Sequence, residues 1–312
     1  MAKPTFRAAP VRVRVPATSA NLGPGFDALG LALTLHDDVV ARVTDSGLSV
    51  DVAGMGAATV ARNARNLVVR AMRAAFDRLG GRPAGLEVVC ANRIPHGRGL
   101  GSSAAAIVAG IVAARSLVAG GSERLDDAAA LALATDMEGH PDNVAACLLG
   151  GLTLAWTDEA GAHAERLDVD PSLAPVALVP GSSSSTKATR RLLPEVVPHA
   201  DAARNAGRAA LLVEALRRRP DRLLAATEDR LHQPYRAEAM PRTAALLGEL
   251  RERGVPAVVS GAGPTVLALT TTETRDDVAA MTRRGWTVLP LDVDVAGAAV
   301  VPLETRREQP NG

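Results

Sequence analysis

The chain contains 312 residues, of which 47% are hydrophobic but only 2% aromatic, so its interior must be built largely from alanine, valine and leucine. This length suggests one large or two medium domains. Thirty-five lysines and arginines against 34 aspartates and glutamates give a net charge of +1, which argues against nucleic acid or an anionic membrane surface as a partner. Because the sequence has neither a membrane-spanning apolar run nor a signal-peptide core, we expect a cytoplasmic protein.

The first half of the chain alternates strand patterns with helix patterns. Apolar and charged residues alternate over residues 11–15, which predicts a strand with one exposed face. Further strands are predicted over 38–43, 48–52 and 86–90, and helices over 66–81, 103–118 and 125–137. The stretch GGLTLAW then indicates another strand, and residues 157–175 are predicted to be irregular and to lead into a second unit.

The second half opens with the strand pattern PVALVP and a serine-rich loop that begins a helix. Helices are predicted over 201–218 and 242–253, followed by a strand, a Gly-Pro turn, a strand, and a final helix and strand that reach about residue 301. Strands and helices do not alternate strictly as βαβ units, so the sequence favours an α+β fold with two domains. We place these domains at residues 1–165 and 166–303, and we expect the polar tail 304–312 to be disordered.

The glycine-rich stretch RIPHGRGLGSSAAA, residues 93–106, predicts a phosphate-binding loop. It lacks the lysine of a P-loop, and eight residues separate Gly99 from the strand that ends at Cys90, which disfavours a dinucleotide-binding turn. Glycines allow backbone N–H groups to surround an anion, and the helix that starts near Ser102 adds the positive end of its dipole. Two other stretches, PATSANLGPGFDALGLAL and EGHPDNVAACLLGG, also gather polar side chains beside regular elements.

Five stretches together resemble the GHMP kinases. Residues 95–105 are similar to the phosphate loop of that superfamily, and SGAGPTVLAL at 260–269 to its C-terminal glycine motif. Within the superfamily, TSANLGPGFDALGLAL, EGHPDN and HQPYR are distinctive of the homoserine kinases. The motifs occur in the expected order and cover nearly the whole chain.

The resemblance implies a domain of the ribosomal-S5 domain-2 type, followed by a ferredoxin-like domain. It also implies transfer of the γ-phosphate of ATP, with Mg²⁺, to the hydroxyl group of L-homoserine, which gives O-phospho-L-homoserine on the route to threonine. A homodimer is the family-based expectation. Two alternatives remain: a GHMP kinase for another alcohol, such as mevalonate or shikimate, and a non-catalytic sensor with the same fold.

The resemblance also assigns residues to ATP and the metal. Ser103 and Glu138 are expected to hold Mg²⁺, which prefers oxygen ligands and few protein donors. Asn66 is expected near adenine. The loop expected to surround the phosphates contains Pro95, Gly97, Arg98, Gly99, Leu100, Gly101, Ser102, Ser103 and Ala104.

For homoserine, the resemblance assigns Arg190 and Arg236 to the carboxylate, which the planar guanidinium group can bind through two oxygens. Asp27 is assigned to the ammonium group. The polar groups expected to line the pocket are Asn21, His140 and Asn143, with Asn143 near the reacting hydroxyl.

No carboxylate other than Asp27 is free to act as a general base once Glu138 is assigned to the metal. The implied mechanism therefore relies on proximity and electrostatics, and the proton passes to a γ-phosphate oxygen, or through Thr186 or water. Asn143, Thr186 and Glu138 are the expected catalytic residues.

Overall fold

The computed structural model describes residues 3–184, 186–281 and 284–303. The tail 304–312 lies outside this described part, and so does the side chain of Thr186, so the predictions made for them have no structural counterpart here. Within the described residues, no helix has the length and apolar character needed to cross a membrane.

The first domain is built on a sheet in which β2 is central. The strand order is β11-β1-β2-β4-β3, and β5 pairs antiparallel with the first residues of β2 and in turn with β6. The strands β3 and β4 are parallel, as the helical crossover α1 (Leu67–Arg78) between them allows. The strands are β1 (Val11–Ala20), β2 (Leu29–Thr44), β3 (Gly47–Gly54), β4 (Gly85–Asn92), β5 (Leu152–Asp158), β6 (Gly161–Leu167) and β11 (Ala299–Val301).

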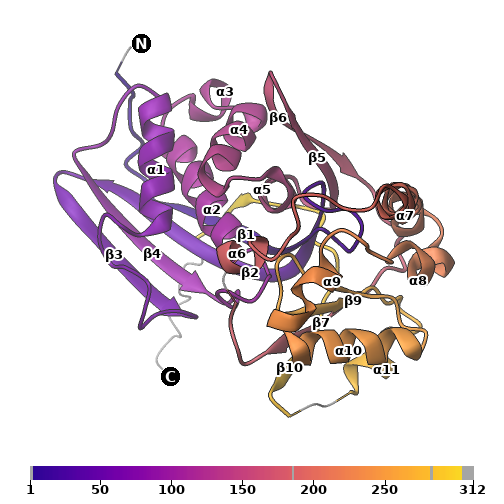
Figure 1. Cartoon of the computed structure of the whole chain (residues 1–312). Helices are drawn as coiled ribbons and strands as arrows, with labels where there is room; N and C mark the ends of the chain where they lie inside the picture. Colours follow the sequence, from indigo (N-terminus) through magenta and orange to yellow (C-terminus); the bar gives the residue numbers. More distant parts are fainter. Residues whose placement is uncertain (1–2, 185, 282–283, 304–312) are drawn as a thin grey trace.

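A layer of helices covers one face of this sheet (Figure 1). The central helix, α2 (Ser102–Leu117), packs against α1, α4, α5 and the strands β1 and β2, which agrees with its apolar sequence on almost every side. The core is formed mainly by alanine, valine and leucine, as the composition predicts. The other helices of this layer are α3 (Gly121–Arg124), α4 (Asp127–Glu138) and α5 (Pro141–Leu149).

The second domain contains a four-stranded antiparallel sheet in the order β10-β7-β9-β8. Its strands are β7 (Val176–Pro180), β8 (Ala257–Val259), β9 (Val266–Ala268) and β10 (Trp286–Pro290). With helices between β7 and β8 and between β9 and β10, the chain follows the β-α-β-β-α-β succession of ferredoxin-like domains. Its helical segments are α6 (Thr186–Arg190), α7 (His199–Arg217), η1 (Pro220–Arg222), α8 (Leu223–Ala226), α9 (Gln233–Arg236), η2 (Ala237–Ala239), α10 (Pro241–Glu252) and α11 (Arg275–Ala279).

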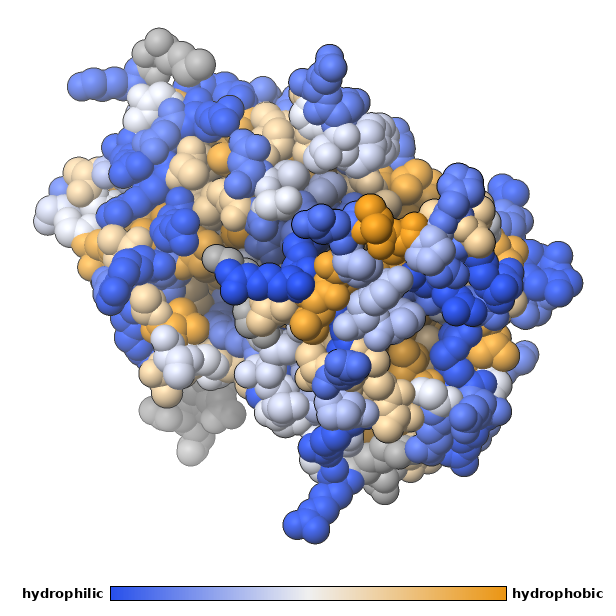
Figure 2. Space-filling model, in the orientation of Figure 1, coloured by the Kyte–Doolittle hydropathy of each residue, from blue (hydrophilic) through white to orange (hydrophobic). Residues whose placement is uncertain are grey.

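The structure differs from the sequence prediction in three places. The strand over residues 38–43 is part of the much longer β2, in which the buried carboxylates Asp37 and Asp38 are held by hydrogen bonds. The segment predicted to be irregular contains β6, and the predicted boundary between residues 165 and 166 falls inside it. The last described strand, β11, returns to pair with β1, so residues 299–301 belong to the first sheet. On the face seen in Figure 2, hydrophilic residues are spread between smaller apolar areas.

Candidate active site

The phosphate loop predicted from the sequence leads directly into α2. Its glycines Gly97, Gly99 and Gly101 have φ angles of 64°, 77° and 69°, a left-handed conformation that residues with side chains rarely adopt. A Cβ atom on Gly101 would also collide with Thr18 Oγ1. Gly101 caps α2 without any side-chain hydrogen bond to the helix, so the first amides of α2 remain available for an anion.

A polar cavity of about 150 Å³ lies between this loop and the second domain. It brings together most of the residues predicted for phosphate, metal and substrate, although they come from positions 21 to 236. Its lining includes Asn21, Asp27, Gly97, Gly99, Gly101, Ser102, Ser103, Glu138, His140, Asn143, Arg190 and Arg236.

Some residues predicted for the phosphate loop do not face this cavity. Pro95, Leu100 and Ala104 are buried behind the loop, where they fix its backbone. The Arg98 guanidinium donates hydrogen bonds to the carbonyl oxygens of His96, Pro180 and Gly181, at 2.7, 3.1 and 2.7 Å. It therefore joins the loop to the second domain.

Ser103 and Glu138 meet at the edge of the cavity. The Ser103 hydroxyl donates to Glu138 Oε2 at 2.7 Å, because the first turn of α2 lies beside the last residue of α4. The pair combines a hydroxyl and a carboxylate, oxygen donors of the type that Mg²⁺ takes from proteins. Among the described residues, no group of three or more His, Cys, Asp and Glu side chains could hold a metal ion by itself.

The start of α5 supplies three connected polar side chains. His140 Nδ1 lies 2.7 Å from Asp142 Oδ1, and this hydrogen bond raises the pKa of His140 above its usual value of 6.5, although partial burial opposes the shift. Asp142 also accepts from the Asn143 amide at 2.7 Å. The helix begins at Pro141, so Asp142 lies inside its first turn.

Asn143 is held in place from the opposite side by a residue that the sequence analysis missed. The Thr18 hydroxyl donates to Asn143 Oδ1 at 2.8 Å, and the Thr18 amide donates to the Leu100 carbonyl at 3.1 Å. Thr18 therefore connects the phosphate loop to the residue expected near the reacting hydroxyl. Thr18 lies in the ATSAN stretch, which belongs to one of the family motifs. Its contact with Asn143 could not be predicted from that motif, because the two residues are 125 positions apart.

The loop between β1 and β2 has an unusual backbone conformation. Asn21, Leu22 and Asp27 have φ angles of 69°, 49° and 53°, which is uncommon for residues with side chains. The Asn21 side chain stabilises this loop, since its Oδ1 accepts from the Asp27 amide at 2.9 Å and its Nδ2 donates to the Gly261 carbonyl at 3.0 Å. The loop thereby directs the Asp27 side chain into the cavity.

Asp27 and Arg190 form a two-point ion pair across the cavity. Arg190 Nη1 donates to Asp27 Oδ2 at 2.9 Å, and Nη2 donates to Oδ1 at 2.6 Å. The family resemblance assigns these residues to opposite charges of one substrate, so their mutual contact is an unexpected feature.

Arg236 is almost completely buried, with 2% of its surface exposed, and it forms no ion pair within the described part of the chain. Its Nε has no hydrogen-bond partner among the residues that the structure describes. Burial lowers the pKa of Arg236, and the charge of Arg190 lowers it further. Its Nη1 lies 3.1 Å from Nδ1 of His232, whose Nε2 lies 2.8 Å from the Gly23 carbonyl. Burial lowers the pKa of His232, which favours a neutral ring that donates from Nε2 and accepts from Arg236.

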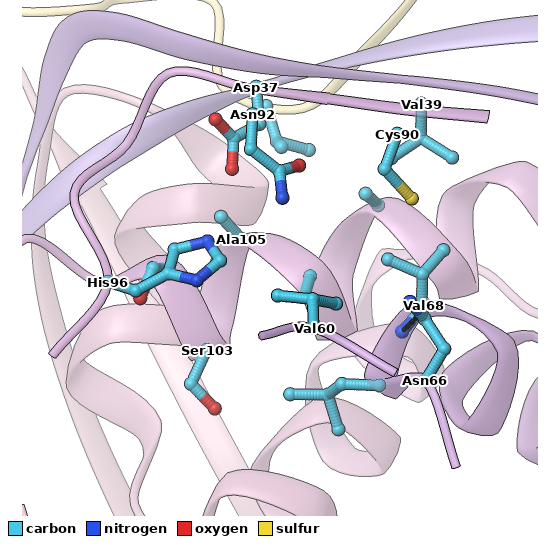
Figure 3. A pocket seen from close by; sticks show the side chains of 15 residues that line it. Asp37, Val39, Val60, Asn66, Val68, Cys90, Asn92, His96, Ser103 and Ala105 are labelled. Atoms are coloured by element: carbon cyan, nitrogen blue, oxygen red, sulfur yellow. Dashed lines mark hydrogen bonds between the residues drawn. The ribbon is translucent and has the colours of Figure 1, made fainter. Parts of the chain in front are cut away.

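A second cavity, of about 260 Å³, lies on the other side of the phosphate loop and shares Ser102 and Ser103 with the first. Its wall is largely apolar, and Figure 3 shows Val39, Val60 and Val68 around it together with Asn92 and His96. Its shape and lining suit a nucleotide base.

Asn66 lines this second cavity, but its amide is already engaged. Its Oδ1 accepts from Val68 N and Val69 N and so caps α1, while its Nδ2 donates to the Ala61 carbonyl at 2.9 Å. Asn66 therefore shapes the cavity wall by fixing the start of α1. The Cys90 thiol also faces this cavity, and burial raises its pKa to about 12.

Comparison with known proteins agrees with this geometry. The models of the GHMP kinase N-terminal and C-terminal domains match residues 66–151 and 211–286. A homoserine kinase of Streptomyces coelicolor is 64% identical over 305 residues, which cover 98% of this chain and 99% of that protein. The chain belongs to the homoserine kinases, within the GHMP kinase superfamily. A member of the same family from Clavibacter michiganensis subsp. michiganensis is 54% identical, with 93% of each chain covered.

Solved structures support the fold of this homoserine kinase family member. The crystal structure of homoserine kinase from Cytophaga hutchinsonii matches with a TM-score of 0.81 and 26% identity, and covers 95% of this chain and 98% of that one. The mevalonate kinase of L. major matches with a TM-score of 0.67, 95% and 97% coverage and 16% identity, which indicates a shared fold. These matches confirm the two-domain α+β GHMP kinase fold predicted from the sequence.

Proposed function

We propose that the chain binds ATP and L-homoserine in these two adjoining cavities and transfers the γ-phosphate to the homoserine hydroxyl. The observation that carries this proposal is their junction at Ser102 and Ser103. One cavity suits the base of a nucleotide, and the other presents charges of both signs that suit an amino acid. The phosphate loop lies between them. Phosphoryl transfer depends mainly on such positioning and on charge stabilisation.

The phosphates would lie against the loop from Gly97 to Ser103. The left-handed glycines turn the backbone of this loop, and the uncapped amides of α2 supply donors for phosphate oxygens. The Arg98 side chain supports this role indirectly, through its bonds to the second domain.

Ser103 and Glu138 fit a magnesium ion by their chemistry and by their contact. A hydroxyl and a carboxylate 2.7 Å apart at the edge of the phosphate cavity can supply two oxygen ligands. When bound there, Mg²⁺ would neutralise charge on the phosphates. Glu138 contributes the negative charge that makes this position favourable for a cation.

The charged walls of the polar cavity match the two charges of homoserine. Arg236 is buried without an ion-pair partner among the described residues, so the substrate carboxylate would compensate a charge that is otherwise left alone. The Asp27–Arg190 pair would separate when homoserine binds, with Asp27 taking the ammonium group and Arg190 joining Arg236 at the carboxylate. Asp27 and Arg190 would then each exchange one charged partner for another, and Arg236 would gain one.

The structure offers few groups that could remove the hydroxyl proton. Asp142 is engaged by His140 and Asn143, Glu138 faces Ser103, and Asp27 faces Arg190. We therefore propose that the proton passes to a γ-phosphate oxygen, or through the Thr186 hydroxyl or water. Asn143, held by Thr18, would orient the homoserine hydroxyl.

The decisive experiment measures ADP release from ATP with L-homoserine, mevalonate and shikimate in parallel, each with and without Mg²⁺. We expect activity with homoserine that depends on Mg²⁺ and little activity with the other two alcohols. Release with mevalonate or shikimate instead would reassign the substrate, and release with none would indicate a non-catalytic protein. We also propose a cytoplasmic homodimer, which fractionation and sedimentation would test.

A further inference from the structure

Phe26 lies beside the charged groups of the polar cavity, in a chain with few aromatic residues. The sequence has only three phenylalanines, two tryptophans and one tyrosine, so an aromatic ring at this position needs a local explanation. Phe26 is half-buried and belongs to neither hydrophobic core, whereas Phe76 fills the first core. Packing of the hydrophobic core therefore does not explain why a phenylalanine stands at position 26.

Three side chains surround the Phe26 ring. The guanidinium carbon of Arg190 lies 5.5 Å from the ring centroid, and that of Arg236 lies 5.6 Å from it. The His232 ring stacks on it with centroids 5.1 Å apart and an angle of 28° between the planes. Both arginines expected to bind the substrate carboxylate therefore share one aromatic ring.

This contact solves an electrostatic problem. Two guanidinium groups close enough for Arg190 to lower the pKa of Arg236 repel each other when no carboxylate lies between them. The face of an aromatic ring is negative and attracts cations without needing a charge of its own. The Phe26 ring can therefore hold both arginines while leaving their N–H groups available for a ligand.

We propose that Phe26 is a positioning residue that holds Arg190 and Arg236 on its ring and thereby sets the affinity of the site for the homoserine carboxylate. This inference rests on the proposed function, because it concerns the same substrate. The new element is that Arg190 stays on the Phe26 ring when its carboxylate partner changes from Asp27 to the substrate. The ring itself touches no reacting atom.

The test compares Phe26→Leu, which removes the ring, with Phe26→Tyr, which keeps it. Phe26→Leu is expected to raise the KM for homoserine about 5- to 30-fold and to leave the KM for ATP nearly constant. Phe26→Tyr is expected to keep the KM for homoserine within about twofold of the wild-type value. Inhibition by α-aminobutyrate, which has the carboxylate, should weaken by the same factor in Phe26→Leu. Inhibition by 3-aminopropan-1-ol, which lacks it, should not change.

A matched control removes a similar contact elsewhere. The Arg242 guanidinium lies 5.8 Å from the Trp286 ring centroid in the second domain, so Trp286→Leu should leave the KM for homoserine unchanged. The inference is wrong if Phe26→Leu has the same KM for homoserine as the wild type. It is also wrong if the substitution weakens the binding of both inhibitors and of ATP to the same extent. A wild-type protein that does not phosphorylate homoserine would overturn the proposed function and this inference together, whereas the other outcomes bear on Phe26 alone.

Discussion

Glu138 is the last residue of α4 and faces the first turn of α2 through Ser103. Substituting glutamine keeps an oxygen that can accept from Ser103 but removes the negative charge. We expect Glu138→Gln to fold normally and to lose at least about 100-fold in kcat at saturating ATP, homoserine and Mg²⁺, a loss typical for removal of a charged group that stabilises the transition state. Glu123→Gln, at an exposed position of α3, is the control. A kcat of Glu138→Gln close to that of the wild type would show that Glu138 is not a ligand of the metal.

Asp27 can act as a binding group or as a base, and kinetics separate these roles. Because its carboxylate already forms a two-point pair with Arg190, we expect it to exchange that partner for the substrate ammonium. Asp27→Asn should then raise the KM for homoserine while kcat at saturation falls only a few-fold. A base would instead lose about 10²–10⁴-fold in kcat with little change in KM. Steady-state kinetics at saturating ATP decide between these outcomes.

His140 makes the stability of the protein depend on pH. The hydrogen bond that His140 Nδ1 donates to the Asp142 carboxylate raises the pKa of His140 above 6.5 in the folded protein, so the folded state retains this proton to a higher pH than the unfolded chain does. The resulting stabilisation is complete below about pH 6.5 and is lost as the pH rises through the folded pKa. We expect denaturant titrations from pH 5.5 to 8.5 to show this loss in the wild type and not in His140→Gln. The exposed His199→Gln should behave as the wild type, and an equal loss in both variants would contradict the prediction.

At this scale the sequence motifs predict which residues meet, but not how they pair. Asn21, Asp27, His140 and Arg190 reach the predicted cavity because motif residues are fixed by local backbone geometry. The contact between Asp27 and Arg190 joins positions 163 apart, and a local pattern does not encode such a distance. The Asn66 cap is different, because its Oδ1 accepts from amides only two and three residues away, and the N-cap preference of asparagine is a local signal for it.

At the scale of elements, the junction between the phosphate loop and α2 depends on Gly101. Its φ of 69° and the collision of an added Cβ with Thr18 Oγ1 both disfavour any side chain there. We expect Gly101→Ala to lower the free energy of unfolding by about 1–3 kcal/mol and to raise the KM for ATP.

The second domain contains a suitable control for that substitution. Gly248 lies inside α10, and a Cβ added there meets no atom within 4 Å. Gly248→Ala should therefore stabilise the protein by about 0.5–1 kcal/mol without affecting the KM for ATP. Equal effects of the two substitutions on denaturant midpoints and on ATP kinetics would show that the conformation of Gly101 is not critical.

Elements are predictable where the hydrophobic pattern is strong, and those with a weak pattern are not. The apolar runs of α2 and β7 predict buried elements, and both are found. Among the described strands, β6 pairs with β5 alone at the margin of the sheet and carries polar residues, so its alternation gives no clear signal. The three-residue β11 is identified as a strand of the first sheet only by its pairing with β1.

At the scale of the whole molecule, the two domains are joined at the site itself. Ser260 Oγ of the second domain donates to the Gly99 carbonyl at 2.6 Å and lies 2.8 Å from Ser19 Oγ of the first. Asn205 Nδ2, from α7, donates to the Pro24 carbonyl at 2.8 Å. Both the phosphate loop and the Asp27 loop therefore depend on contacts with the second domain, which explains why the polar cavity needs residues from both.

Residues 299–301 add the strand β11 to the first sheet, and this gives a prediction for the molecule as a whole. Strand β11 pairs with β1 through Arg12, Val13 and Arg14, and it also packs against α2. Deleting residues 299–312 would turn β1 into an exposed edge strand, which favours aggregation, and would remove three cross-strand residue pairs. We expect this deletion to lower the free energy of unfolding by about 2–4 kcal/mol, from lost hydrogen bonds and side-chain pairing.

Deleting only residues 304–312 leaves β11 in place and is the matched control, and we expect it to match the full chain in stability and activity. Urea titrations followed by circular dichroism compare the three proteins. Because α2 begins at the phosphate loop, the longer deletion should also raise the KM for ATP, although residues 299–301 are not part of the lining of either cavity. Equal midpoints for the two deletions would mean that β11 adds nothing to the sheet. A loss of stability with an unchanged KM for ATP would show that α2 keeps its position without β11.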